Sequence, residues 1–249
     1  MTSSRLIERQ QHLKKVFHRQ GISMESVHWR MKWNQTTYNS SRSYVYQRLN
    51  LKDKPLDRNQ QRRCPITMEH VDVWYEIAKE KIRLALILED DVIFVPFFKE
   101  KFLRMISTAI HVGALQLNRT CVERREGHIS KDERIEQNPM FVIGSCFHLH
   151  DEYFRQSSSN AFPLLSTQKM NASRCTHAYL LTSCSAQALV EQIHKQKNDF
   201  VNSDFFQNHL FRLSSTLQSF WIDPPLAYQG NQIVDHDQIK SFQGQTQNE

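Results

Sequence analysis

A short apolar run that ends in three consecutive acids constrains the fold of this chain more than any other stretch. Residues 84–88 are apolar at every position, and Glu89, Asp90 and Asp91 follow at once. A run this short is typical of a strand, and a strand without polar alternation is typically buried on both faces. The stretch therefore predicts an α/β fold in which helices cover both sides of a sheet.

The rest of the chain alternates between helical periodicity and short apolar runs, which favours a layered α/β sheet over a helical bundle. The helices that we expect span 4–19 and 67–81, or begin near Pro96, Ser185 and Ser203. The further strands that we expect span 26–33, 140–143, 177–182 and 220–222. Polar stretches predict loops at 34–63, with a short helix near 44–49, and at 118–138 and 151–174.

Composition and charge narrow the classes of function open to the chain, which has 249 residues and a formal net charge of +6. Because the basic residues are scattered, the excess charge indicates a solvated surface and not a nucleic-acid site. No stretch is long and apolar enough to span a membrane, and no apolar signal-peptide segment is visible near Met1. The five cysteines lack C-x-x-C spacing and predict neither a zinc site nor an obvious disulfide framework.

The three adjacent carboxylates after the apolar run predict a cation site. Like charges repel each other, and a hard divalent metal with oxygen ligands, such as Mg²⁺ or Mn²⁺, would stabilise them. In open α/β sheets, ligands bind outside the carboxyl ends of the strands, where Glu89, Asp90 and Asp91 are expected. A solvated acidic turn after a core strand explains the same residues without a ligand.

Several short motifs follow one another in an order that resembles a known family. His70 and Trp74 stand in a predicted helix before the acidic run, and Phe97-Phe98 follow it. The later matches are Val142-Ile143-Gly144, 178–182 with Ser185-Ala186, 202–206, and 221–225. In this order the motifs resemble glycosyltransferase family 25, which includes collagen β-galactosyltransferases and bacterial lipooligosaccharide galactosyltransferases. The resemblance covers about residues 5–235, although Glu69 replaces a family serine and 118–139 aligns poorly.

The resemblance implies a fold and a reaction. The fold would be GT-A-like, an α/β/α sandwich around a mostly parallel sheet. The reaction would move a hexose from UDP-galactose or UDP-glucose to a hydroxyl acceptor on a protein or glycan. Glu89, Asp90 and Asp91 would hold Mn²⁺ or Mg²⁺, which stabilises the charge of the departing diphosphate as a Lewis acid.

The same resemblance assigns roles to residues outside the metal site. Arg5, Arg9, His70 and Asp90 would contact the UDP-sugar donor. Asp204, in the first turn of a short helix, would be the general base of an inverting transfer. Structural roles explain two of these residues as well, because His70 can be a buried, hydrogen-bonded core residue and Asp204 can support its helix terminus.

Two other functions remain open beside the metal-dependent glycosyltransferase. The first is a divergent, non-catalytic GT-A-like protein that binds sugar nucleotides or glycans without turnover. The second is an unrelated Mg²⁺-dependent phosphotransfer domain with an acidic pocket at its strand ends. Turnover of UDP-sugars in the presence of Mn²⁺ distinguishes the glycosyltransferase from both alternatives.

The N-terminus departs from the family pattern. Family members open with an apolar strand before an Arg-rich helix, whereas here no apolar run precedes Arg5 and Arg9. We therefore expect one family 25-like domain over 1–249 that lacks its first strand, with a polar tail at 231–249. An uncovered sheet edge would leave the first helix loosely docked and weaken UDP-sugar binding. The expected compartment is the endoplasmic reticulum or Golgi lumen for a truncated eukaryotic chain, and the cytoplasm otherwise.

Overall fold

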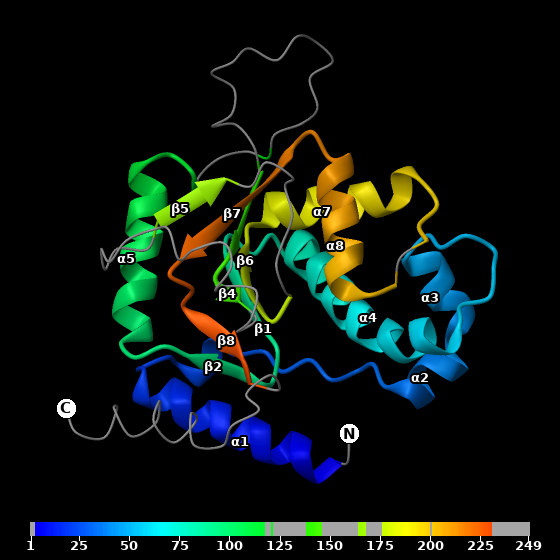
Figure 1. Ribbon diagram of the computed structural model, residues 1–249, viewed down its shortest axis with the longest axis horizontal. Coiled ribbons are helices and arrows are strands. Elements are labelled where there is room, and N and C mark those ends of the chain that lie inside the picture. Colours follow the sequence, from blue (N-terminus) through cyan, green and yellow to red (C-terminus); the bar gives the residue numbers. More distant parts are fainter. Residues whose placement is uncertain are drawn as a thin grey trace.

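The computed structural model describes residues 3–117, 121, 138–145, 164–167, 176–199 and 201–230, so the predicted tail at 231–249 lies outside it. Figure 1 shows the arrangement of its helices and strands. The helices are α1 (Ser3–Arg19), the 3-10 helix η1 (Met24–Ser26), α2 (Gln35–Ser40), α3 (Arg42–Arg48), α4 (Arg58–Lys79), α5 (Phe98–His111), α7 (Ser183–Lys195) and α8 (Ser203–Leu213). The strands are β1 (Ala85–Leu88), β2 (Val92–Phe94), β3 (Asn138–Val142), β4 (Gly144–Ser145), β5 (Leu164–Thr167), β6 (Ala178–Leu181), β7 (Leu217–Asp223) and β8 (Ala227–Gln229).

A five-stranded sheet with the strand order β1-β6-β3-β7-β5 forms the centre of the molecule. β3 and β7 are parallel, but β6 runs antiparallel to both β1 and β3, and β5 runs antiparallel to β7. The sheet is therefore mixed, and the expectation of a mostly parallel sheet is not met among the described strands. An apolar run indicates that a strand is buried, but it carries no information about the direction of that strand.

Helices cover both faces of this sheet (Figure 1). Successive residues of a strand point to opposite faces, so each face needs its own apolar partner. Met140 and Val142 of β3 belong to the apolar cluster that α4, α7 and α8 build on one face. Phe141 and the nearby Ile143 belong to a second cluster, on the other face, with α1 and α5. The predicted α/β fold with helices on both faces is confirmed.

β1 is an edge strand of this sheet. It pairs with β6 alone among the described strands, and Ile87 is its one fully buried residue. Leu86 and Leu88 are partly exposed, although they pack against the cluster that contains α1 and α5. The prediction of a strand here is confirmed. Burial on both faces is met in part, because Ile87 packs against the cluster that contains α4 while the leucines on the other face pack against the second cluster and stay partly exposed.

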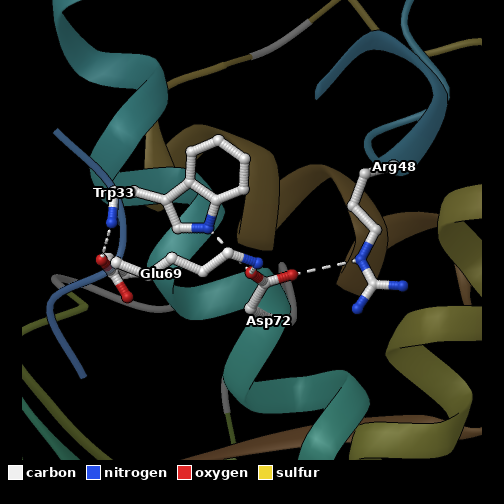
Figure 2. A network of polar contacts seen from close by, with 5 residues as sticks. Trp33, Arg48, Glu69 and Asp72 are labelled. Carbon is white, nitrogen blue, oxygen red and sulfur yellow. Dashed lines mark hydrogen bonds and ion pairs between the residues drawn. The ribbon is translucent and has the colours of Figure 1, made fainter. Parts of the chain in front are cut away.

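The strand predicted at 26–33 is absent from the structure, where Ser26 ends η1 and residues 27–33 join no sheet. Acidic side chains of α4 accept hydrogen bonds from Trp33 in this segment instead, as Figure 2 shows. The backbone N–H of Trp33 donates to Glu69, and its indole Nε1–H donates to Oδ2 of Asp72 at 2.7 Å. Nε of Arg48 donates to the other oxygen of Asp72 at 3.2 Å. The alternation of apolar residues at 26–33 therefore reflects side-chain packing without a strand partner.

The helix α4 starts earlier than its apolar periodicity predicts. We expected its first residue near Thr67, but it begins at Arg58 and contains Pro65 in its interior. Asp57 accepts hydrogen bonds from the N–H groups of Asn59 and Gln60, and the Gln60 side chain accepts from the N–H of Asp57. This reciprocal capping box stabilises the helix start, so part of the predicted loop at 34–63 is helical. α2 and α3 occupy more of that loop.

The other predicted helices form with small changes at their first residues. α5 begins after Phe97, whose φ of 56° is left-handed, and not at Pro96. The side chain of Thr182, and not that of Ser185, caps α7, because Thr182 Oγ1 accepts from the N–H of Ser185 at 3.1 Å. α8 begins at Ser203, as predicted, although the residue at its cap position is Asn202. Within the predicted loop at 151–174, residues 164–167 form β5.

A small second sheet and a disulfide complete the described structure. β8 pairs antiparallel with β2 and parallel with β4. The chain therefore enters this second sheet at β2, directly after the turn that ends β1. Cys121 and Cys184 form a disulfide that ties residue 121 to α7, whereas the sequence predicted no obvious framework. The thiol of Cys64 is free and buried. None of the described helices is long and apolar enough to cross a membrane.

Candidate functional site

The acidic residues predicted as a metal site form the turn between β1 and β2, where the two sheets meet. The N–H of Glu89 donates to the carbonyl oxygen of His177 at 2.8 Å. The N–H of Gly230 donates to the carbonyl oxygen of Asp91 at 2.7 Å. A Cβ atom on Gly230 would lie 2.6 Å from that oxygen, so only glycine permits this approach. The backbone of the turn is thus fixed at both ends.

The carboxylate of Glu89 is directed into the protein toward α4 and β6. Its Oε1 accepts a hydrogen bond from Thr176 Oγ1 at 3.0 Å and lies 3.4 Å from Nε2 of His70. Burial alone would raise the pKa of Glu89, but the hydrogen bonds from His70 and Thr176 and the charge of His70 lower it overall. Glu89 is therefore ionised and already has partners within the chain.

His70, predicted to contact the donor, is a buried residue of α4 with 5% of its surface exposed. Its Nδ1 lies 2.8 Å from the hydroxyl of Tyr179, which also accepts a hydrogen bond from Nε1 of Trp74 at 2.9 Å. Tyr179 is fully buried, and burial raises the pKa of its hydroxyl. These contacts agree with the structural role that the sequence left open for His70.

Asp90 is directed toward the first helix. Its Oδ1 lies 3.1 Å from Nη1 of Arg9 in α1, and both side chains are partly exposed. Two residues predicted to contact the donor are thus paired with each other. Arg5 belongs to the same helix, but its side chain lies outside the described part of the structure.

Asp91 differs from the two acids before it. Its Oδ1 is buried and has no hydrogen-bond partner in the described part of the chain. Burial, followed by the negative charge of Glu89, raises the pKa of Asp91 to about 6, although the charge of Arg9 acts in the opposite direction. The buried carboxylate is therefore electrostatically unsatisfied, which is the condition that a bound cation relieves.

Asp204 lies in the first turn of α8, as predicted, and its Oδ1 is also buried without a partner among the described residues. Burial is the largest cause that raises the pKa of Asp204, and the charge of Glu89 adds to it, against hydrogen bonding from Thr176. The neighbouring Ser203 Oγ lies 3.1 Å from Oγ1 of Thr176. Because Glu89 influences both Asp204 and Asp91, the structure brings the predicted base close to the acidic turn.

His177 is a residue of this site that the sequence did not single out. Only 1% of its surface is exposed, and neither ring nitrogen has a hydrogen-bond partner among the described residues. Burial lowers the pKa of His177, and the charge of Glu89 acts in the opposite direction. Its ring packs against Gly144, where an added Cβ would lie 2.4 Å from Nε2. The segment was predicted only as a strand, and its sequence gives no signal that His177 and Thr176 face the acidic turn.

The predicted metal ligands do not form a joint ligand set. Among the described residues, no three His, Cys, Asp or Glu side chains lie close enough to hold a metal ion. Glu89 and Asp90 have partners within the chain, whereas Asp91 and Asp204 each present a buried, unpartnered oxygen. The open oxygen of Asp91 fits a hard cation that takes its other ligands from a substrate phosphate and water, which is the common arrangement for Mg²⁺.

Fold and site together define an α/β protein with buried carboxylates and imidazoles gathered at the end of an edge strand. The chain belongs to glycosyltransferase family 25, whose sequence profile, described as LPS biosynthesis protein, matches residues 4–207. It is therefore a glycosyltransferase, with a sugar donor and an acceptor as its substrates. Comparison with curated proteins gives no match. The match includes the acidic turn, His70 and Asp204, so every predicted site residue lies within the family region.

Proposed function

We propose that this glycosyltransferase moves a hexose from UDP-galactose or UDP-glucose to a hydroxyl group of a protein or glycan, with inversion and with Mn²⁺ or Mg²⁺ as cofactor. The observation that carries the proposal is the pair of buried, unpartnered carboxylate oxygens of Asp91 and Asp204 beside the acidic turn. Together with family membership, this pair supplies the two functions that such a transfer requires: a cation ligand and a base.

Asp91 is the protein ligand on the metal side. Burial and the charge of Glu89 raise the pKa of Asp91, and a divalent ion would compensate for both. When bound, the ion stabilises the negative charge that grows on the diphosphate as the glycosidic bond breaks. Glu89 and Asp90 surround this position, and Arg9 approaches it through Asp90.

Asp204 is the general base of the proposed transfer. The acceptor oxygen forms a bond to the anomeric carbon, the bond from that carbon to the β-phosphate oxygen breaks, and UDP leaves. The acceptor proton passes to the Asp204 carboxylate. A pKa raised by burial makes this carboxylate a stronger base than an exposed aspartate, which suits it to accept the proton.

The test is an assay of Mn²⁺-dependent hydrolysis and transfer over a panel of UDP-sugars. We expect UDP-hexose turnover in the wild-type protein and loss of Mn²⁺-dependent turnover in Asp91→Asn. Asp204→Asn should lower kcat while donor affinity stays near the wild-type value, because the loss is confined to the transition state. Asp53→Asn, at an exposed carboxylate, is the matched control and should behave as wild type.

Two results would contradict the proposal. Unchanged turnover of Asp91→Asn at saturating Mn²⁺ would exclude its role at the metal. Binding of UDP-sugars without turnover, with every donor and acceptor class of the panel, would instead indicate a divergent protein that binds sugar nucleotides.

A further inference from the structure

A chain of polar contacts, buried at His70 and Tyr179 and partly buried at Glu89, runs from α4 toward α8. On one side of Glu89, the Nε1–H of Trp74 donates to the Tyr179 hydroxyl, and this hydroxyl meets His70 Nδ1. His70 Nε2 then lies 3.4 Å from Glu89 Oε1. On the other side, the hydroxyl of Thr176 donates to the same oxygen at 3.0 Å.

The donors of this chain of contacts converge on Glu89. The indole of Trp74 can only donate, so the Tyr179 oxygen accepts from it and directs its own proton to His70 Nδ1. The other ring nitrogen of His70, Nε2, faces Oε1 of Glu89 at 3.4 Å. The ionised carboxylate of Glu89, which only accepts, is the point at which both sets of donors converge.

The chain continues from Glu89 to the start of α8. The Thr176 hydroxyl also lies 3.1 Å from Ser203 Oγ, and hydrogen bonding from Thr176 acts on Asp204 as well. Ser203 is the first residue of α8, is 8% exposed and directly precedes Asp204. Glu89 is thus connected through two hydroxyl groups to the backbone that carries Asp204.

These contacts give Glu89 a different environment from Asp91. Asp91 Oδ1 has no partner among the described residues, whereas Oε1 of Glu89 accepts from Thr176 and faces His70. Coordination of a metal by Glu89 Oε1 would compete with the hydrogen bond that orders Thr176, and through it Ser203. The oxygen of Glu89 that orders Thr176 is therefore already engaged within the chain, whereas the Oδ1 of Asp91 is open.

We propose that Glu89 is not a metal ligand but a positioning residue, which holds Asp204 in place through Thr176 and Ser203. The inference rests on the proposed function of the site, in which Asp91 is on the metal side and Asp204 is the base. Each acid of the turn then has its own role. Glu89 positions the start of α8, Asp90 pairs with Arg9 of α1, and Asp91 is left open to bind a cation.

The first test compares the metal affinity and kinetics of four variants. Mn²⁺ affinity, measured by calorimetry in the presence of UDP, should stay within threefold of wild type in Glu89→Gln and Thr176→Val and fall at least tenfold in Asp91→Asn. Glu89→Gln and Thr176→Val should lower kcat at least tenfold with little change in donor KM. Thr176→Ser keeps the hydroxyl and should restore kcat. Glu100→Gln, at an exposed glutamate of α5, is the control.

The second test needs neither metal nor turnover. Hydrogen exchange of the backbone amides at 203–207 should be at least tenfold faster in Glu89→Gln and Thr176→Val and unchanged in Asp91→Asn and Glu100→Gln. If wild type shows neither Mn²⁺ binding nor turnover, the proposed function fails, and this exchange measurement still decides the positioning role. If Glu89→Gln does not fold, Thr176→Val carries both tests.

Either of two results would overturn the inference. A loss of Mn²⁺ affinity in Glu89→Gln as large as that in Asp91→Asn would make Glu89 a ligand. Wild-type exchange at 203–207 in Thr176→Val would show that the start of α8 does not depend on this chain of hydrogen bonds.

Discussion

Nη1 of Arg9 lies 3.1 Å from Oδ1 of Asp90, and this ion pair joins α1 to the acidic turn across 81 positions of sequence. Both side chains are about one quarter exposed, at 28% each. A pair in this environment contributes little to stability, on the order of 0–1 kcal/mol, and salt screens it. Its position beside Asp91 makes it more relevant to ligand binding than to folding.

We therefore predict that Arg9→Gln lowers the free energy of unfolding by less than about 1 kcal/mol but weakens UDP binding about tenfold. The charge of Arg9 acts on Asp91, and its loss removes positive charge from the region where the diphosphate is proposed to bind. Urea unfolding and calorimetry with UDP measure the two quantities. Arg104→Gln, on α5, serves as the control for loss of a positive charge, and equal UDP affinity in wild type and Arg9→Gln would remove Arg9 from the donor site.

The raised pKa of Asp91 gives a prediction about pH. The folded state binds this proton more tightly than the unfolded state, with a pKa of about 6 against 3.8, so stability falls as pH rises through this window. Above the window the cost is at most about 3 kcal/mol. In the absence of metal, Asp91→Asn should therefore be about 1–3 kcal/mol more stable than wild type at pH 7.5, with the difference disappearing near pH 4.

The same variant provides a metal-dependent control. Added Mn²⁺ should stabilise the wild-type protein at pH 7.5, by about 2.7 kcal/mol at a hundredfold excess over Kd, and should not stabilise Asp91→Asn. Thermal unfolding at several pH values, with and without Mn²⁺, measures both effects. A variant less stable than wild type at pH 7.5 without metal would contradict the electrostatic explanation.

The hydroxyl of Tyr179 is the centre of a buried hydrogen-bond arrangement, which makes it sensitive to a small change. Tyr179→Phe leaves the indole N–H of Trp74 and Nδ1 of His70 without their partner in the interior. An unsatisfied buried polar group costs about 1–3 kcal/mol. We expect a loss of about 2–4 kcal/mol in urea unfolding, against less than about 0.5 kcal/mol for Tyr44→Phe at an exposed position. A loss in Tyr179→Phe as small as in the control would exclude a role of this hydroxyl in stability.

Local patterns in the sequence predicted the parts of this structure that depend on local physics. The apolar run before Glu89, the helix predicted at 4–19 and the helix predicted near Pro96 all match elements that form. These features follow from the burial of one helix face or of a short strand, and neighbouring residues alone determine them. The acidic turn was found for the same reason, because its three acids are consecutive.

Features that depend on partners distant in sequence could not be predicted in this way. The direction of β6 follows from its connections, and the start of α4 was missed because its first residues belong to the polar stretch that predicted a loop at 34–63. Glu89 and Asp91 are equivalent in sequence, yet Thr176 and His70 engage one and leave the other open. Thr176 lies 87 positions from Glu89, so no local pattern could reveal their contact.

The contact between Gly144 and His177 leads to the last prediction. A Cβ atom added to Gly144 would lie 2.4 Å from Nε2 and 2.8 Å from Cε1 of His177, and the ring cannot move away easily because it is 1% exposed. Gly144→Ala should therefore cost about 1–3 kcal/mol through overpacking. Because the clash involves the imidazole, His177→Ala should remove most of this cost, and the double variant should be more stable than the sum of the single effects predicts.

A double-mutant cycle of urea unfolding measures this coupling, which we expect at about 1–2 kcal/mol in favour of the double variant. Gly113→Ala provides a contrast, because its positive φ of 75° makes the alanine strained for backbone reasons that His177→Ala cannot relieve. Additive effects of Gly144→Ala and His177→Ala would show that the glycine is required by the backbone and not by the ring. Coupling would establish that the sheet edge at Gly144 is shaped to hold an imidazole beside the acidic turn.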